Sequence, residues 1–248
     1  MKKHKTQDAA TGERIAKRLA RAGVASRRGA EKLIAEGRVA VDGVVLSSPA
    51  LNVSPAAHIT VDGKPVSAPE RRRLWLYHKP RGLITSHHDP QGRPTVFDAL
   101  PAGMPRVISV GRLDVNSEGL LLLTNDGALA RRLELPQTGW RRRYKVRVFG
   151  TPDEAALAAL AKGLTVEGVR YGPVAARLES CKGRNAWLSI TLREGKNREI
   201  RRIMEHLGLK VNRLIRLAFG PFQLGGLPAG EVREVAGKIL AEQLGGRE

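Results

Sequence analysis

The chain contains little that would support a secreted, membrane-bound or metal-dependent protein. Its 248 residues include a single cysteine, Cys181, which excludes an intrachain disulfide and a zinc site built on several thiolates. No apolar run approaches the ~20 residues of a membrane-spanning helix, and no apolar segment follows the basic start of the chain as in a secretory signal. Carboxylates are not clustered as a divalent-metal nuclease would need. We therefore expect a cytoplasmic protein without a bound metal ion.

Aromatic residues are also scarce, whereas positive charge is abundant. Aromatics make up 4% of the chain, which argues against a long platform for stacked bases. Lysine and arginine outnumber aspartate and glutamate by 43 to 24, so the formal net charge is +19. Such a charge favours an anionic polymer as partner, and nucleic acid is the first choice. A basic surface without a specific partner is the alternative.

The first quarter of the chain predicts a small basic domain over residues 12–68, preceded by a disordered basic tail over residues 1–11. Apolar residues at helical spacing indicate two short helices, the second capped by Ser26 and ended by Gly37. Short strands separated by Asp-Gly turns follow.

Several basic side chains of this domain, with one hydroxyl, are candidates for contact with RNA. They are Arg14, Lys17, Ser26, Arg27, Arg28, Lys32 and Arg38. Backbone N–H groups and fixed positive charge at the start of the second helix favour a phosphate there, although a solvated basic face is the plainer reading. Residues 14–17, 25–28 and 37–43 together resemble the S4 RNA-binding domain.

The rest of the chain, residues 71–241, predicts an α+β unit with a mixed or antiparallel sheet. A strand over residues 74–79 should resume at residues 83–85 after a Pro-Arg-Gly interruption. One helix should be capped by Thr151, and a second should open at Asn197.

Residues 107–127 are the most informative stretch. They read as a β-branched strand, a tight loop, an apolar strand and an Asn-Asp-Gly turn. The loop holds Asp114, with Arg112 two residues before it. A carboxylate bracketed by apolar neighbours is a poor core residue and a candidate nucleophile or base, although a lone loop aspartate is more often structural.

Five segments in order along the chain resemble the ribosomal pseudouridine synthases of the RsuA/RluB type. They are residues 78–82, 111–114, 142–146, 194–202 and 213–221. The resemblance implies an α+β fold: a small S4-like α/β domain, and a larger catalytic domain on a mixed, mainly antiparallel sheet flanked by helices. It also implies conversion of a specific uridine of ribosomal RNA to pseudouridine. Large-subunit RNA is the preferred substrate and small-subunit RNA the alternative.

The resemblance assigns three catalytic positions. Asp114 would be the nucleophile, and attack at C6 of the ring or at C1′ of the sugar both stay open. Tyr144 would stack on the uracil, and Lys196 would place a cation beside Asp114. The reaction involves no net oxidation or hydrolysis, so no cofactor is implied.

Further residues would hold the RNA. Arg112 would fill the space left by the flipped base or contact phosphate, and Leu217 would form an apolar wall of the uracil pocket. The RNA backbone would be held by Lys79, Arg81, Arg198, Arg201 and Arg202. We expect a monomer whose partner is ribosomal RNA or a ribosomal assembly intermediate. A non-catalytic RNA-binding assembly protein would explain the charge equally well, but would not need Asp114.

Overall fold

A computed structural model describes residues 12–135 and 139–245, so the predicted disordered tail over residues 1–11 lies outside the described residues. Contacts between Cα atoms divide the chain into two compact units, Met1–Arg72 and Arg73–Glu248. Along the part of the chain that the structure describes, no helix is both long and apolar enough to cross a membrane.

The smaller unit packs two helices against short strands. Its elements are β1 (Glu13–Arg14), α1 (Ile15–Arg21), α2 (Arg27–Ala35), β2 (Val39–Val41), β3 (Val44–Val45), β4 (Asn52–Val53), β5 (Ile59–Val61) and β6 (Lys64–Pro65). The strands form a sheet of order β3-β2-β5-β6 and a separate β1-β4 pair. The Oγ of Ser26 accepts a hydrogen bond from the N–H of Gly29 at 2.9 Å, which confirms the predicted cap of α2. Ile15, Leu19 and Ile34 are fully buried between the helices and the strands.

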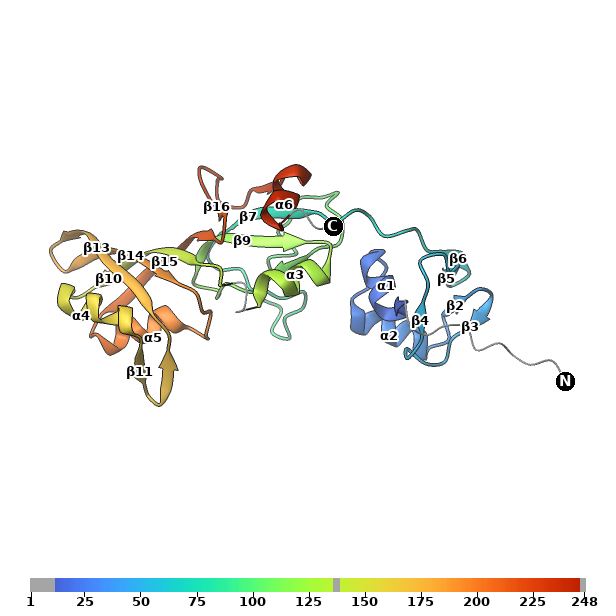
Figure 1. Ribbon diagram of the computed structural model, residues 1–248, viewed down its shortest axis with the longest axis horizontal. Helices are drawn as coiled ribbons and strands as arrows, with labels where there is room; N and C mark the ends of the chain where they lie inside the picture. Colours follow the sequence, from blue (N-terminus) through green and yellow to red (C-terminus); the bar gives the residue numbers. More distant parts are fainter. Residues whose placement is uncertain (1–11, 136–138, 246–248) are drawn as a thin grey trace. The chain divides into compact units, whose positions relative to one another are not determined.

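The larger unit is built on a nine-stranded sheet whose main order is β13-β14-β10-β15-β9-β7-β17, with β16 beside β15 and β8 beside β9 (Figure 1). The strands are β7 (Leu74–Lys79), β8 (Ile108–Val110), β9 (Glu118–Thr124), β10 (Arg142–Phe149), β13 (Val174–Lys182), β14 (Asn185–Leu192), β15 (Lys210–Phe219), β16 (Phe222–Gln223) and β17 (Val232–Glu234). Only the β15–β9 pair of this sheet is parallel. The predicted mixed, mainly antiparallel sheet is confirmed.

Helices and short elements surround this sheet. They are α3 (Gly127–Glu134), α4 (Glu154–Ala159) with a 3-10 turn (Leu160–Lys162), a hairpin of β11 (Leu164–Val166) and β12 (Val169–Tyr171), α5 (Glu199–His206) and α6 (Gly237–Gln243). Alternate residues of β9 enter different apolar clusters: Leu120 and Leu122 pack with α3 and α6, and Leu121 and Leu123 pack with the long loop between β7 and β8. Both faces of the sheet are therefore covered at β9.

Two local predictions in the first half of this unit are wrong. Residues 83–85 do not resume the strand, because Ile84 makes only an isolated bridge to Thr95 within the loop. The Asn-Asp-Gly sequence opens a helix rather than forming a turn: Asp126 Oδ1 accepts hydrogen bonds from the N–H groups of Ala128 at 2.7 Å and Leu129 at 3.0 Å.

Two predicted helix caps lie elsewhere than expected. Asp153, not Thr151, caps α4, because its Oδ1 accepts from the N–H of Ala155 at 2.9 Å. Arg198, not Asn197, directly precedes α5, and its positive φ of 51° turns the chain into the helix without a side-chain cap.

Candidate active site

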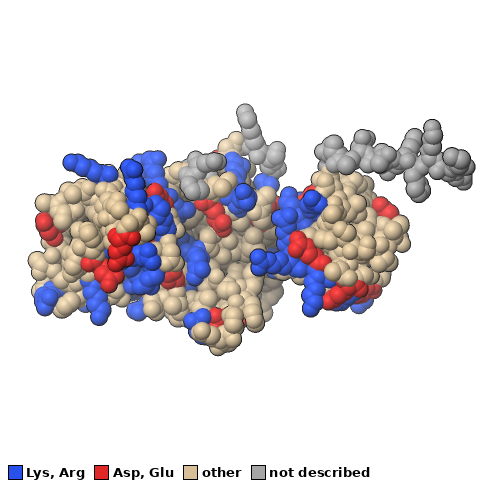
Figure 2. All heavy atoms as spheres, turned by 90° about the horizontal axis from the view of Figure 1, so that it is seen from below, with Lys and Arg blue, Asp and Glu red and all other residues tan. Residues whose placement is uncertain are grey.

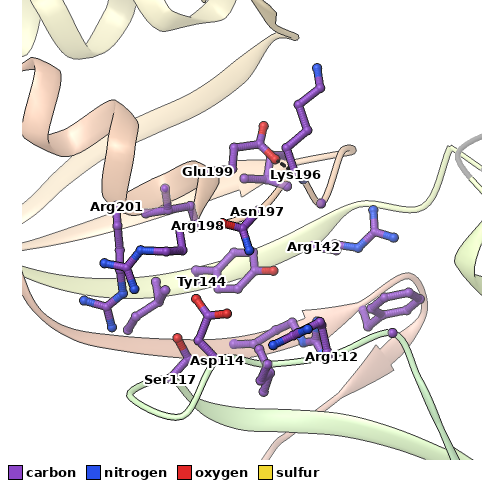
Figure 3. A pocket seen from close by; sticks show the side chains of 18 of the residues that line it. Arg112, Asp114, Ser117, Arg142, Tyr144, Lys196, Asn197, Arg198, Glu199 and Arg201 are labelled. Carbon is purple, nitrogen blue, oxygen red and sulfur yellow. Dashed lines mark hydrogen bonds between the residues drawn. The ribbon is translucent and has the colours of Figure 1, made fainter. Parts of the chain in front are cut away.

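The larger unit contains a cleft of about 400 Å³ between the loop after β8, the strands β10 and β15, and the start of α5 (Figure 3). Its lining residues are Gly111, Arg112, Leu113, Asp114, Ser117, Glu134, Arg142, Tyr144, Leu192, Gly195, Lys196, Asn197, Arg198, Glu199, Ile200, Arg201, Leu214, Arg216 and Phe219. The two catalytic candidates Asp114 and Tyr144 thus face the same cavity, although they lie 30 positions apart in the sequence.

The loop that carries Asp114 is held from beneath by a buried lysine. Lys79 is 0% exposed, and its ammonium donates hydrogen bonds to the carbonyls of Pro80 (3.0 Å), Asp114 (3.2 Å) and Ser117 (2.9 Å). The N–H of Ser117 also donates to the carbonyl of Asp114 at 2.9 Å, which closes a turn around the aspartate. The expectation that Lys79 binds the RNA backbone is wrong, because its ammonium is buried and bound to these carbonyls.

Burial also changes the protonation of this lysine. It lowers the pKa of Lys79 from 10.5 to about 8, while the carboxylates of Asp114 and Glu118 act in the opposite direction. The ammonium is therefore the predominant form at neutral pH, and carbonyl oxygens take the place of water around it.

A glycine joins the two halves of the sheet beside this loop. Gly119 on β9 has a φ of +106°, and a Cβ there would lie 2.3 Å from the carbonyl oxygen of Arg216 on β15. Only a residue without a side chain allows this close parallel pairing of β9 with β15. The pairing brings the Asp114 loop, at the start of β9, next to the cleft-facing part of β15.

Tyr144 lies on β10 and is 8% exposed. Its ring lies between Asp114 and the residues that precede α5 (Figure 3), and Leu192 and Leu214 line the same cavity. A planar aromatic surface with apolar neighbours can accept a flat base, and a carboxylate beside it can react with that base.

Arg201, rather than Lys196, contacts the Asp114 loop from the start of α5. Arg201 on α5 donates to the carbonyls of Asn116 at 3.0 Å and Val211 at 3.1 Å, and Asn116 belongs to the Asp114 loop. Burial lowers the pKa of the Arg201 guanidinium below its ordinary value, and the charge of Asp114 acts against that shift. The sequence predicts contact of Arg201 with the RNA backbone, whereas its guanidinium binds these two carbonyls.

The side chain of Lys196 points away from Asp114 (Figure 3). Its ammonium donates to the carbonyl of Arg170 at 2.6 Å, pairs with Glu194 at 2.5 Å and lies 5.6 Å from the centroid of the Tyr171 ring. The predicted position of this ammonium beside Asp114 is therefore wrong, although Lys196 does line the cleft.

Leu217 does not form the apolar wall that was expected of it. It does not line the cleft and packs, together with Ile215, against the apolar cluster that contains residues of α3 and α6. In the pairing of β15 with β10, Arg143 lies opposite Ala218 and Tyr144 opposite Arg216, so a β-bulge skips Leu217. Leu214, rather than the predicted Leu217, lines the cleft.

Of the other four arginines predicted to contact RNA in the larger unit, two line the cleft and two do not. Arg112 and Arg198 are exposed and line the cleft. Arg202 and Arg81 are exposed and outside its lining, and the charge of Arg81 contributes to the lowered pKa of Arg201. Figure 2 shows Lys and Arg side chains in a band across one face of this unit, with acidic side chains beside it.

Two further arginines line the cleft, Arg216 and Arg142, and the sequence pattern does not predict this position for them. Arg216 is 3% exposed, its Nε donates to the carbonyl of Leu120 at 2.7 Å, and its guanidinium lies 5.3 Å from the centroid of the Phe219 ring. Arg142 lies 4.7 Å from the same ring and donates to the carbonyls of two residues ahead of α5, Arg193 and Glu194. Both residues lie in segments that carry the family resemblance, 142–146 and 213–221, but these segments do not reveal burial.

A buried glutamate, Glu199, also lines the cleft and was not predicted. It is 4% exposed, and one carboxylate oxygen accepts from the N–H of Lys196 at 2.9 Å. The other oxygen has no hydrogen-bond partner within the described residues, and burial raises the pKa of this carboxyl.

The candidates of the smaller unit lie around α1 and α2. Arg14 and Arg27 line a small hollow of about 290 Å³ with Glu31, and Arg28 is exposed beside Arg27 at the start of α2. The other basic candidates form ion pairs within this unit: Lys17 with Glu13 at 3.4 Å, Lys32 with Glu36 at 3.7 Å, and Arg38 with Asp62 at 2.6 Å. Arg27 and Arg28 are thus the exposed cations nearest the N-terminus of α2.

Comparisons with known proteins identify the family of the chain. The sequence profile of the RNA pseudouridylate synthase family matches residues 73–206, and that of the S4 domain matches residues 13–59. An uncharacterized RNA pseudouridine synthase of Rickettsia prowazekii is 49% identical over 231 residues, which cover 93% of this chain and 97% of that protein. The ribosomal large subunit pseudouridine synthase B of Salmonella typhi is 45% identical over 228 residues, covering 88% of this chain and 77% of that protein.

A solved structure shares the fold. The crystal structure of a pseudouridylate synthase superposes with a TM-score of 0.64 at 27% identity, covering 93% of this chain and 99% of that one. The matched profile of residues 73–206 includes Asp114, Tyr144 and the start of α5. The chain therefore belongs to the RNA pseudouridylate synthase family, and it is an enzyme that isomerises uridine to pseudouridine.

Proposed function

We propose that this protein converts one uridine of ribosomal RNA to pseudouridine, with Asp114 as the nucleophile. The observation that carries the proposal is the placement of Asp114 in the cleft, on a loop that Lys79 holds through three carbonyls and opposite the ring of Tyr144. A carboxylate fixed in this way is ready for attack on a bound base or sugar without reorganisation of the loop.

The reaction begins with removal of the uridine from its stack in the RNA. The ring of Tyr144 then stacks on the uracil and offsets part of the lost stacking. Arg112, exposed at the mouth of the cleft, fills the space that the base has left or binds an adjacent phosphate. Leu192 and Leu214 form the apolar wall against which the uracil packs.

The chemical steps need only one covalent intermediate. Asp114 forms a bond to C6 of the ring or to C1′ of the sugar, and the bond between N1 and C1′ breaks. The uracil then turns within the cleft, C5 bonds to C1′, and the bond to Asp114 is released. C5 loses a proton and N1 gains one, so atoms and charge balance. Arg201 holds the loop that carries Asp114 through the carbonyl of Asn116.

The preferred substrate in this proposal is large-subunit ribosomal RNA, with small-subunit RNA as the alternative. The support is the 45% identity to the Salmonella typhi protein, which is named a ribosomal large subunit pseudouridine synthase. The smaller unit would bind RNA phosphate through Arg27 and Arg28 at the N-terminus of α2. We further propose that the protein acts as a monomer in the cytoplasm, on free RNA or on an assembly intermediate.

Mapping of pseudouridine in total ribosomal RNA tests this proposal. Cells that lack the protein are complemented with the wild type or with Asp114→Asn. We expect one large-subunit pseudouridine to be lost in the deletion strain and restored by the wild type alone. An unchanged map would contradict a ribosomal target, and restoration by Asp114→Asn would contradict the role of Asp114.

A further inference from the structure

One face of the larger sheet is not covered by helices over β10, β13 and β14. Tyr144, Val146 and Val148 of β10 enter the apolar cluster formed with α4 and α5, which lie on the same side of these strands (Figure 1). Because side chains alternate along a strand, the intervening residues of β10 point to the opposite side. We call this side the open sheet face; its residues are Arg143, Lys145, Arg147, Phe149, Arg177, Trp187 and Ser189.

Strand pairing brings cations and aromatic rings together on the open sheet face. Arg147 lies directly opposite Trp187, and Ser189 lies between Lys145 and Arg177 in the register. The ammonium of Lys145 lies 5.2 Å from the centroid of the Trp187 ring. At one end of the face, the Arg184 guanidinium lies 4.6 Å from the centroid of the Phe149 ring, whose residue is 38% exposed. The open sheet face thus combines rings with cations, the combination that surfaces binding unpaired nucleotides use.

Charge on the open sheet face is positive and incompletely neutralised. Glu179 pairs with Lys145 at 3.8 Å and Glu118 pairs with the neighbouring Arg213 at 2.5 Å. Within residues 12–135 and 139–245, neither Arg147 nor Arg177 forms an ion pair, and both are exposed. Free guanidinium groups beside a tryptophan ring match the two parts of a nucleotide, its phosphate and its base.

We propose that the open sheet face is a second RNA-binding surface, which holds a part of the substrate RNA distant from the modified uridine. Arg147 and Arg177 bind phosphates, and Trp187 stacks on an unpaired base. The proposal rests on the proposed function in that it takes RNA as the substrate. Tyr144 of the cleft and Lys145 of the open sheet face alternate along β10, so the two surfaces lie on opposite sides of the same sheet. An RNA segment bound in the cleft therefore does not also cover this face, and a large folded RNA is required to reach both.

The first test compares Arg147→Ala/Arg177→Ala with a control of equal charge change, Arg233→Ala/Lys238→Ala, at exposed positions of β17 and α6. Binding is measured against salt concentration with full-length large-subunit RNA and with a short hairpin that carries the modified uridine. For the long RNA, we expect the Arg147/Arg177 variant to lose on the order of tenfold in affinity and about 2 units of salt slope. Affinity for the hairpin and its conversion should stay as in the wild type. Equal binding of the two double variants to the long RNA, or an equal loss on both RNAs, would overturn the proposal.

A second test isolates the stacking contact. Trp187→Ala and Trp187→Phe are compared after urea unfolding has shown that both are folded. We expect Trp187→Ala to bind the long RNA several-fold more weakly and Trp187→Phe to keep most of the affinity, because phenylalanine still offers a ring. Hydroxyl-radical footprinting should show that the protection lost in Trp187→Ala lies outside the modified hairpin. A folded Trp187→Ala with wild-type binding and footprint would overturn the proposal.

Pseudouridine formation tests the proposed function, and RNA binding tests the open sheet face separately. A wild type that forms no pseudouridine in either RNA contradicts the proposed function, whereas the binding comparison still decides the role of the open sheet face. A change in sedimentation of the RNA-free protein on substitution of Arg147 and Arg177 would show a face that joins copies of the chain and would overturn the RNA assignment.

Discussion

Replacement of Lys79 by methionine should loosen the catalytic loop while keeping the shape of the side chain. The ammonium of Lys79 donates to the carbonyls of Pro80, Asp114 and Ser117 at 2.9–3.2 Å, and methionine cannot donate to any of them. The carbonyl of Asp114 still accepts from the N–H of Ser117, whereas the carbonyls of Pro80 and Ser117 lose the donor that the structure gives them, at about 1–3 kcal/mol each. Removal of a buried charge offsets part of that cost, by about 3 kcal/mol for a pKa lowered from 10.5 to about 8. We expect a net loss of about 1 kcal/mol in the free energy of unfolding.

The effect on turnover should be larger than the effect on RNA binding. Because Lys79 binds the carbonyl of Asp114 itself, its loss displaces the nucleophile, and a displacement of about 1 Å can cost on the order of 10²-fold in rate. Single-turnover conversion of ribosomal RNA, RNA affinity and urea unfolding would be measured for Lys79→Met. Lys162→Met, at an exposed position, is the matched control. Wild-type turnover and stability in Lys79→Met would refute this reasoning.

Three further predictions concern the same site. Arg201→Ala should lower turnover on the order of 10²-fold and Lys196→Ala by less than about tenfold, since Arg201 binds the Asp114 loop and Lys196 does not; single-turnover rates at saturating RNA check this, and the reverse order would contradict the geometry. Gly119→Ala should lower the free energy of unfolding by more than about 3 kcal/mol in urea, because its Cβ would lie 2.3 Å from the carbonyl oxygen of Arg216; a loss below about 1 kcal/mol would show that β15 can yield. As pH rises from about 8 toward 10.5, the folded protein releases the Lys79 proton while the unfolded chain keeps it, so this group raises the free energy of unfolding of the wild type over that window. Urea unfolding at pH 7 and 9.5 should show no such contribution in Lys79→Met. The same pH dependence in both proteins would exclude Lys79 as its source.

Much of the fold could be predicted because its signals are local. The cap at Ser26 and the strand over Leu74–Lys79 follow from the residues at those positions and their neighbours. The placement of Asp114 in a loop between two strands follows from the apolar pattern of residues 107–124. The residues around Asp126 predict a turn, whereas Asp126 caps α3 in the structure. An Asn-Asp-Gly sequence is compatible both with a tight turn and with the start of a helix.

The errors in the site have a common physical origin in contacts between distant segments. The burial of Lys79 depends on carbonyls up to 38 residues away, and these make a charged residue acceptable inside the protein. The direction of Lys196 depends on the carbonyl of Arg170, 26 residues earlier. Leu217 was misplaced because one skipped residue in the β10–β15 pairing reverses which side chains face the cleft.

The central claim is that Asp114 is the nucleophile, and single-turnover pseudouridine formation by purified Asp114→Asn tests it most directly. The variant is incubated in excess over transcribed large-subunit RNA, and pseudouridine is measured by mass spectrometry beside the wild type and Asn116→Ala, a matched change in the same loop. Asparagine keeps the size of the side chain but cannot act as a carboxylate nucleophile. We predict a rate lower on the order of 10³-fold or more for Asp114→Asn with unchanged RNA affinity. A rate for Asp114→Asn within about tenfold of the wild type would contradict the account.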